Sequence, residues 1–362
     1  MALQMGIVGL PNIGKSTLLN ALSHAHADAS NYPFCTIDRN IGTATIEDPR
    51  LQRLAALLRP EETIPATIRF VDIAGLVRGA SRGEGLGNQF LGHVREVDAL
   101  VHVVRCFDSG TVVHVEGKVD PAADFEIVET ELLLADLETV ERHRKKIQQA
   151  GKADPKGAAA ELLVVDRLAE HLGEGTALRR IDLDEEAREK ARELCLLTLK
   201  PVVVVANCAE DDPNGGAACV SGLRRALKEE PVLPLAVSLE EELSRLDPAE
   251  RDLFLEDLGL PARGLDRLLE VSGRLLGLIP FYTSAHGKLQ AWLIPEGTKA
   301  PAAAGRIHTD MERGFIRVEV IRPEDLEEHP TRAALQEHGR IRTEGKEYRI
   351  REGDVCQFLF QP

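Results

Sequence analysis

The chain has 362 residues, and its 44 Lys and Arg against 59 Asp and Glu give a formal net charge of −15. This acidity excludes a protein that coats nucleic acid through overall positive charge. At about 150 residues per domain, the length indicates two or three globular domains. The apolar runs are far shorter than the roughly 18 residues that a membrane helix needs, and no signal peptide is recognised, so we expect a cytoplasmic protein without membrane association.

The first segment is typical of a strand, a glycine turn and a helix. Residues 3–8 are apolar, residues 9–14 contain the turn, and leucines at helical spacing follow in residues 15–22. Four further apolar runs are typical of strands covered on both faces, at residues 67–71, 99–104, 201–206 and 232–237. The sequence therefore predicts an α/β fold built on a doubly wound sheet.

Residues 122–199 separate two of these strands and contain no strand signal, so they form an insertion. Leu133, Leu137, Val140 and Ile147 lie near a four-three alternation, and Gly151 ends the pattern. Residues 158–172 and 185–199 show two more helical patterns. We interpret the insertion as an antiparallel helical arm.

A basic cluster, Arg142, Arg144, Lys145 and Lys146, lies near the end of the first arm helix. Such a cluster is typical of a solvated face that complements the helix dipole. It also suits contact with RNA phosphates. The residues alone leave both interpretations open.

The C-terminal segment has a different character. Short alternating runs separated by Gly, Pro and Asp predict strands at 289–294, 315–320, 347–351 and 355–360. Residues 281–362 carry a net charge of −1, so the rest of the chain carries −14. We expect four segments: a nucleotide-binding domain in two parts (1–121 and 200–280), the helical arm (122–199) and a small β-rich domain (281–362).

The loop Gly9-Leu10-Pro11-Asn12-Ile13-Gly14-Lys15-Ser16 matches the phosphate-binding pattern G-x-x-x-x-G-K-[ST] between a strand and a helix. Successive backbone N–H groups converge on phosphate oxygens, Lys15 reaches the β- and γ-phosphates, and the Ser16 hydroxyl is a ligand for Mg²⁺. The predicted nucleotide-binding residues of this loop are Gly9, Asn12, Ile13, Gly14, Lys15, Ser16 and Thr17.

A second motif, Asp72-Ile73-Ala74-Gly75, directly follows the apolar run 67–71. Asp72 is predicted to hold the magnesium shell through water, and the Gly75 backbone N–H to contact the γ-phosphate. Thr36 lies between the two motifs, where a second hydroxyl ligand for Mg²⁺ is expected. The order and spacing of the motifs predict a site that responds to the γ-phosphate.

Three long stretches, residues 6–19, 31–38 and 70–91, closely resemble the YchF subfamily of the Obg-like translation-factor GTPases. The runs 297–301, 307–310 and 314–317 resemble the TGS domain of that subfamily. The resemblance implies a Ras-like nucleotide-binding domain, an inserted coiled-coil arm, a C-terminal TGS domain and a ribosomal partner.

The position of the guanine-reading Asn-Lys-x-Asp tetrad is occupied by Asn207-Cys208-Ala209-Glu210. Glu is longer than Asp and the lysine cover over the base is lost, so a guanine-specific match is not preserved. Asn207 can bond adenine N7 and N6–H₂, with Cys208 as a small apolar contact. The resemblance to a subfamily with this Asn-x-x-Glu variation implies a preference for ATP, with GTP weaker, through Asn207 and Glu210.

Catalysis is expected to be slow, because Leu76 stands where Ras-like enzymes often carry a water-orienting glutamine. The sequence alone favours an ordinary loop histidine at His114, whereas the resemblance points to His114 as the residue that positions water. Lys15 is the second catalytic candidate, and Arg78, Arg82 and Arg95 are possible arginine fingers.

We therefore predict an ATPase with Mg²⁺ as cofactor that acts as a nucleotide-dependent switch on the ribosome or a translation complex. Local RNA contact through the basic cluster stays open. Two alternatives stay open: a GTPase with relaxed base specificity, and a weakly catalytic module in which ATP braces the arm and TGS domain against RNA or protein.

Overall fold

A computed structural model describes residues 3–24, 40–73, 86–108, 114–115, 117–151, 155–216, 218–260 and 262–361. The predictions made for Thr36, Gly75, Leu76, Arg78 and Arg82 lie outside these residues. The chain divides into a larger compact unit, residues 4–42 and 70–265, and a smaller one, residues 1–3, 43–69 and 266–362. None of the helices in the described ranges is long and apolar enough to cross a membrane.

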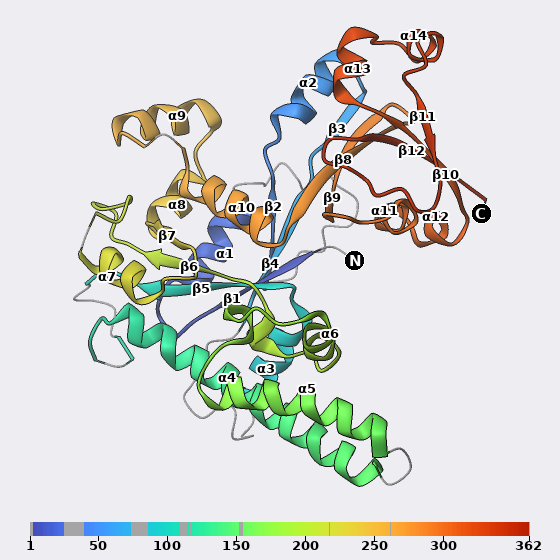
Figure 1. Cartoon of the computed structure of the whole chain (residues 1–362). Coiled ribbons are helices and arrows are strands. Elements are labelled where there is room, and N and C mark those ends of the chain that lie inside the picture. The colour runs from blue at the N-terminus through green and yellow to red at the C-terminus, as the bar shows by residue number, and fades with distance from the viewer. Residues whose placement is uncertain are drawn as a thin grey trace. The chain divides into compact units, whose positions relative to one another are not determined.

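A six-stranded sheet in the order β2-β4-β1-β5-β6-β7 carries the phosphate loop (Figure 1). Its strands are β1 (Gln4–Val8), β2 (Ile41–Thr45), β4 (Thr67–Asp72), β5 (Ala99–Arg105), β6 (Val202–Asn207) and β7 (Val232–Leu235). β1, β5, β6 and β7 pair in parallel, and every residue of β5 and β6 is buried. Such burial explains their continuous apolar sequences. The predicted α/β fold class is confirmed, and β2 is a strand that the sequence analysis missed.

The helices of the larger unit follow these strands in the alternating order of a doubly wound fold. They are α1 (Lys15–His24), α3 (Leu86–Glu96), α7 (Ala218–Ala226), α8 (Val237–Leu243) and α9 (Pro248–Asp257), and α10 (Gly264–Leu275) begins at the end of the unit. Leu18, Leu19 and Leu22 of α1 are buried, as their helical spacing predicts.

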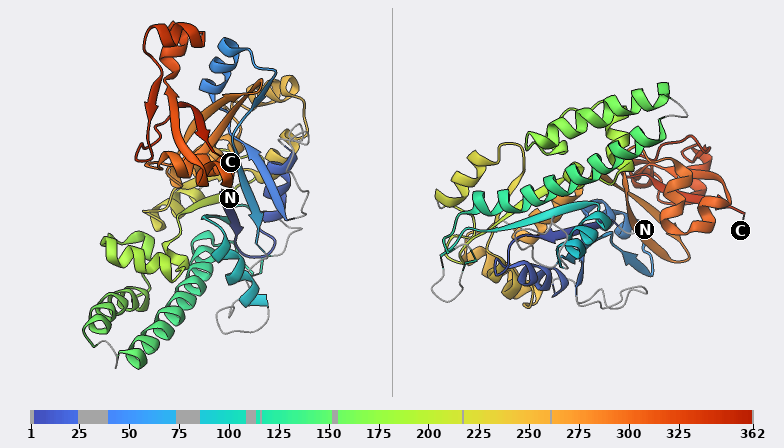
Figure 2. Two further views of the ribbon diagram at one scale, coloured as in Figure 1. Left: turned by 90° about the vertical axis from the view of Figure 1, so that its right-hand side faces the viewer. Right: turned by 90° about the horizontal axis from the view of Figure 1, so that it is seen from below.

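The arm consists of α4 (Pro121–Ala150), α5 (Pro155–Gly173), η3 (Leu178–Arg180), α6 (Glu185–Glu193) and η4 (Leu197–Leu199). Both views of Figure 2 show α4 and α5 side by side. Leu133, Val140 and Ile147 of α4 share an apolar cluster with Val164, Val165 and Leu168 of α5. At about 1.5 Å per residue, the 30 residues of α4 span about 45 Å. The predicted helical arm is thus present, and Gly151 caps α4 as expected.

The helix predicted over residues 185–199 is wrong in its second half. α6 ends at Glu193, and Cys195 adopts a left-handed conformation with φ of 52°. The backbone N–H groups of Leu197 and Thr198 then donate to the buried Asp136 carboxylate on α4, at 2.7 and 2.8 Å. A tertiary partner therefore replaces the helical hydrogen bonds that local periodicity predicts.

The smaller unit contains a second sheet in the order β11-β10-β12-β8-β9-β3. Its strands are β3 (Glu62–Ile64), β8 (Leu278–Ala285), β9 (Lys288–Pro295), β10 (Phe315–Ile321), β11 (Arg342–Glu344) and β12 (Val355–Phe360). Its helices are α2 (Pro49–Leu58), α11 (Ala300–Ile307), α12 (Thr309–Arg313), α13 (Pro323–Glu328) and α14 (Arg332–Glu337). The predicted strand at 347–351 is wrong: this segment contributes one isolated bridge, between Lys299 and Arg349.

Residues 43–69 lie with the C-terminal residues, whereas the sequence analysis grouped them with the nucleotide-binding segment. β3 pairs in parallel with β9, and Glu62 lies opposite Lys288. Leu51 and Leu54 of α2 share an apolar cluster with Tyr282 and Leu289. These contacts join segments far apart in sequence, which periodicity does not reveal.

Candidate functional site

The phosphate loop links β1 to α1 and has a backbone that requires small residues. Gly9 and Gly14 have φ values of 143° and 101°. A Cβ on Gly9 would lie 2.5 Å from the Val103 carbonyl oxygen, and one on Gly14 would lie 2.5 Å from Asn207 Nδ2. Asn12 is also left-handed, with φ of 62°. Both glycines of the motif are therefore needed for the loop to follow this path.

Lys15 begins α1 and folds back over the loop. Its Nζ donates to the carbonyl oxygens of Gly9 (3.1 Å) and Leu10 (2.7 Å), and the residue is buried. Burial lowers the pKa of Lys15, and the negative charge of Asp72 opposes this shift. The ammonium group thus lies in the loop, where it can exchange carbonyl oxygens for phosphate oxygens.

Ser16 and Asp72 meet at the start of α1 and the end of β4. The Ser16 hydroxyl donates to Asp72 Oδ2 at 2.8 Å, so the structure brings together these two predicted magnesium residues. The second carboxylate oxygen, Oδ1, is buried and has no hydrogen-bond partner among the described residues. A buried carboxylate oxygen without a donor is unfavourable unless a cation or water satisfies it, so this pair fits a magnesium site.

Asn207, at the end of β6, ties the phosphate loop to the next strand-to-helix connection. Its Nδ2 donates to the Ile13 carbonyl oxygen at 2.9 Å, and its Oδ1 accepts the Val237 backbone N–H at 3.2 Å. The side chain is buried. Sequence reasoning assigned Asn207 only to the base, and the structure adds a role in holding the loop.

The next residues of the tetrad differ in exposure. Cys208 is buried, its Sγ donates to the Ala206 carbonyl oxygen at 3.2 Å, and burial raises the pKa of its thiol to about 11. Glu210 is exposed on the turn that follows. Of the two, only the Glu210 side chain is open to a ligand from solvent.

His114 lies at the start of the arm. Its side chain is buried, and its Nε2 pairs with Asp124 Oδ2 at 2.9 Å. Asp124 is in the first turn of α4, which begins with Asp120 as its N-cap. The sequence offered no signal for Asp124, because an acidic residue in a first helical turn is common for dipole reasons alone.

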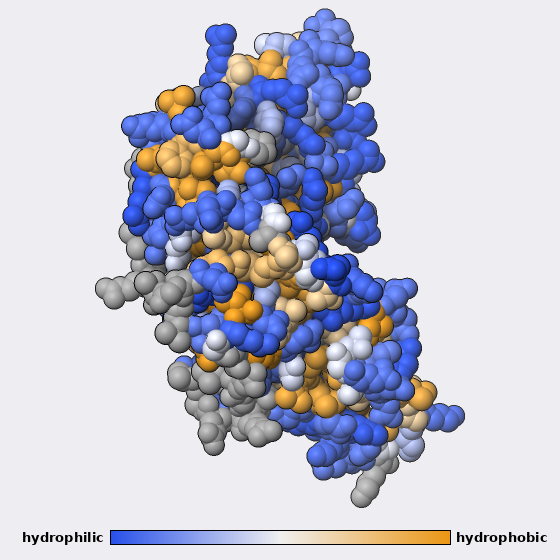
Figure 3. All heavy atoms as spheres, turned by 90° about the vertical axis from the view of Figure 1, so that its left-hand side faces the viewer, coloured by the Kyte–Doolittle hydropathy of each residue, from blue (hydrophilic) through white to orange (hydrophobic). Residues whose placement is uncertain are grey.

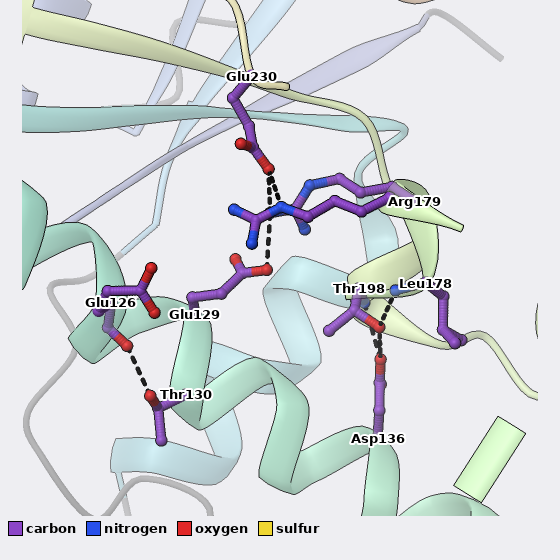
Figure 4. Close-up of polar contacts among 9 residues, drawn as sticks. Glu126, Glu129, Thr130, Asp136, Leu178, Arg179, Thr198 and Glu230 are labelled. Carbon is purple, nitrogen blue, oxygen red and sulfur yellow. Dashed lines mark hydrogen bonds and ion pairs between the residues drawn. The ribbon is translucent and has the colours of Figure 1, made fainter. Parts of the chain in front are cut away.

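Polar contacts fix the base of the arm to the rest of the larger unit (Figure 4). Arg179 Nη2 lies 2.7 Å from Glu129 on α4 and 3.2 Å from Glu230, which precedes β7. Arg180 Nε lies 2.6 Å from the same Glu230 oxygen. On α4, Asp136 also accepts the Thr198 hydroxyl at 2.7 Å. Glu129 and Glu230 are buried, and the network connects α4 to the segment that leads into β7.

A loop of this geometry on a parallel sheet, with its lysine, hydroxyl and carboxylate in place, defines a P-loop nucleoside triphosphatase. A family model described as a 50S ribosome-binding GTPase matches residues 4–133. A second family model, the YchF-GTPase C-terminal family, described as a protein of unknown function, matches residues 278–361.

Full-length relatives narrow this class. The chain is 46% identical over 361 residues to the ribosome-binding ATPase YchF of Escherichia coli O157:H7, with 99% of each chain covered. It is 45% identical over 364 residues to the protein of the same name from Bacillus subtilis, covering 99% of this chain and all of the relative. The solved Schizosaccharomyces pombe YchF GTPase matches with a TM-score of 0.88 and 34% identity, over 99% of this chain and 97% of that one. The chain belongs to the YchF family.

Proposed function

We propose that this chain is a cytoplasmic, Mg²⁺-dependent ATPase that prefers ATP to GTP, turns over slowly and binds the ribosome or a ribosomal subunit according to its nucleotide state. The observation that carries the proposal is the Lys15, Ser16 and Asp72 arrangement, with its unsatisfied carboxylate oxygen beside the phosphate loop. The relatives named ribosome-binding ATPase support the partner.

The loop residues bind and orient the triphosphate. Lys15 exchanges the carbonyl oxygens of Gly9 and Leu10 for the β- and γ-phosphates, so the loop keeps a cation at its centre in both states. Ser16 directly, Asp72 through water, and Thr36 would hold Mg²⁺. When bound, Mg²⁺ neutralises charge that develops on the phosphates.

The base preference depends on the end of β6. One Asn207 amide hydrogen is used by Ile13, which leaves the second for N7, an acceptor that adenine and guanine share. A preference for adenine through Asn207 would come from its Oδ1, which accepts the Val237 N–H and can also accept adenine N6–H₂. Glu210 replaces the aspartate that reads guanine and is exposed. An unmatched polar pair costs about 1–3 kcal/mol, so discrimination between ATP and GTP should lie between roughly 5-fold and 150-fold. Parallel titration with ATP and GTP tests this, and tighter GTP binding would refute it.

Slow turnover follows from the absence of a water-orienting glutamine, since Leu76 follows the second motif. We assign water positioning to His114, which must first leave its bond to Asp124. The bond to Asp124 would compete with water positioning, which is a second reason to expect slow intrinsic hydrolysis. Turnover should fall in a His114→Ala variant, and an unchanged rate would remove His114 from the mechanism.

A basic groove supports local RNA contact. A cavity of about 880 Å³ lies between α3 and α4, and Arg95, Arg142 and Lys146 line it beside Glu138. Arg142 lies 3.6 Å from Glu138, and Arg144 pairs with Asp166 at 2.8 Å and Glu141 at 3.3 Å, within the arm. Phosphates of ribosomal RNA fit the groove by charge, and screening beyond about 8–10 Å lets it act apart from the net charge of −15.

Charge reversal tests this groove. Arg142→Glu with Lys146→Glu should lower ribosome affinity and reduce the slope of log affinity against log salt by about 2. Arg192→Glu, on the exposed face of α6, is the matched control. An unchanged salt slope would restore the interpretation of a solvated face.

The switch itself is tested by ribosome co-sedimentation with ATP, GTP, ADP and no nucleotide. Equal ribosome binding in all four conditions would exclude a nucleotide-dependent switch and favour the alternative of a weakly catalytic binding module. Multiple-turnover phosphate release above that of a Lys15→Ala variant separates an enzyme from such a module. The TGS assignment of residues 281–362 belongs to the same proposal, as a folding and docking module of nearly neutral charge.

A further inference from the structure

The helix α9 is fixed at both ends but is barely buried. Asp247 caps it by accepting the backbone N–H groups of Ala249 and Glu250, each at 3.1 Å. At the other end, Gly259 has φ of 64° and the Leu260 N–H donates to the Leu255 carbonyl oxygen at 2.9 Å. Leu255 is the one buried residue of the helix. The caps therefore hold in place a helix whose remaining side chains stay largely open.

Large apolar side chains gather on this open helix. Eight large hydrophobic residues stand out as exposed in the described part of the chain, and three of them lie within six successive positions: Leu253 (65% exposed), Phe254 (43%) and Leu258 (40%). Figure 3 is viewed from the left-hand side of Figure 1, where α9 is labelled, and shows orange hydrophobic groups exposed among blue hydrophilic ones. Single exposed leucines are ordinary, whereas a contiguous group indicates a binding surface.

Helix geometry spreads these three residues over the outer faces. At about 100° per residue, Phe254 and Leu258 lie about 40° apart on the same side of Leu255, about 100° and 60° from its direction. Leu253 points about 160° away from Leu255. The apolar group thus forms a ridge that cannot be covered by the cluster of Leu239, Leu243, Leu255 and Leu260 beneath it.

The ridge is bordered by negative charge. Within residues 247–258 the carboxylates are Asp247, Glu250, Asp252, Glu256 and Asp257, and the one cation, Arg251, lies 3.7 Å from Asp252. Nucleic acid and anionic lipid are repelled by such a border, and a second copy of this chain, with its net charge of −15, is disfavoured for the same reason. A basic protein surface with an apolar groove complements both the ridge and its border.

We propose that α9 is a docking helix for a basic protein surface of the ribosome, which receives Leu253, Phe254 and Leu258 in an apolar groove. This inference rests on the proposed ribosome binding. It assigns α9 to a protein contact, separate from the basic groove between α3 and α4.

The test uses the full chain and purified ribosomes. Leu253→Ser with Phe254→Ser should lower co-sedimentation affinity by at least about tenfold, without loss of ATPase activity in the absence of ribosomes. The matched control is Leu163→Ser, which removes a 69% exposed leucine from the arm helix α5. Glu250→Lys with Asp257→Lys should weaken binding too, with Glu186→Lys on α6 as the charge control. A photocrosslinking phenylalanine analogue at position 253 should then label a ribosomal protein.

The outcomes separate the two proposals. If the unaltered chain does not sediment with ribosomes, the proposed function and this inference both fail. If it sediments but the α9 variants bind equally well, or the analogue labels ribosomal RNA, a second copy of the chain or nothing, only the inference fails. Circular dichroism of each variant shows whether its fold is retained. If the Leu253→Ser, Phe254→Ser variant unfolds, the Glu250→Lys, Asp257→Lys variant, whose substituted residues are exposed, still tests ribosome binding by α9.

Discussion

Asn207→Ala would separate the structural and nucleotide-binding roles of the β6 terminus. The substitution removes the 2.9 Å bond to the Ile13 carbonyl and the 3.2 Å bond from the Val237 N–H, both in buried surroundings. Each buried group left without a partner costs about 1–3 kcal/mol, so we expect the free energy of unfolding to fall by about 2–6 kcal/mol. Because Ile13 belongs to the phosphate loop, affinity for ATP and GTP should fall together.

The comparison variant is Glu210→Ala, which alters an exposed side chain. It should leave the free energy of unfolding within about 0.5 kcal/mol of the original while changing the ratio of ATP to GTP affinity. Urea unfolding of the nucleotide-free chain and titration with both nucleotides measure these quantities. An Asn207→Ala chain of unchanged stability would refute the loop-holding role.

Three further substitutions have defined outcomes. Asp72→Asn should raise the Mg²⁺ concentration for half-maximal ATPase activity by about 10–100-fold, because it removes the anionic oxygen beside Ser16. Burial lowers the pKa of His102 to about 3. Between about pH 6.5 and pH 3 the unfolded chain therefore binds more protons than the folded chain. As the pH falls through this range, the free energy of unfolding should decrease by up to about 1.4 kcal/mol per pH unit. His102→Phe, which keeps the stack on Phe125, should therefore flatten the acid side of the stability profile. Glu230→Ala should cost about 1–3 kcal/mol, because it removes the 2.6 Å partner of Arg180 while Arg179 keeps Glu129.

Each of these three predictions would be refuted by a specific result. An unchanged magnesium requirement in Asp72→Asn would remove this residue from the metal shell. Equal slopes of unfolding free energy against pH, measured by urea titration from pH 7 to pH 4, would show that His102 is not held neutral. A Glu230→Ala chain that melts at the original temperature would show that the network at the arm base adds nothing to stability.

Local patterns predicted the phosphate loop and the strands that carry it. The alternation of β1, loop and α1 is set by neighbouring residues, and β5 and β6 are apolar throughout because both of their faces are covered. The arm core at Leu133, Val140 and Ile147 could also be predicted, because apolar residues recur at helical spacing on one face of α4.

Distant partners explain what the sequence analysis missed. The pairing of β3 with β9 depends on segments at opposite ends of the chain. The end of α6 is set by the Asp136 carboxylate, which belongs to another helix. Likewise, the bonds of Asn207 to Ile13 and of His114 to Asp124 are contacts between side chains or loops that residue type alone does not specify.

The pairing of β3 with β9 has a consequence for biosynthesis. Glu62 cannot meet Lys288 until the ribosome has translated the intervening residues, which takes about 10–45 s at about 5–20 residues per second. Through that interval, Leu51 and Leu54 lack Tyr282 and Leu289, their partners in the apolar cluster. The nascent chain therefore exposes the apolar side chains of Leu51 and Leu54 while the arm is being translated. A protein that binds ribosomes thus completes its own smaller unit only as its synthesis ends.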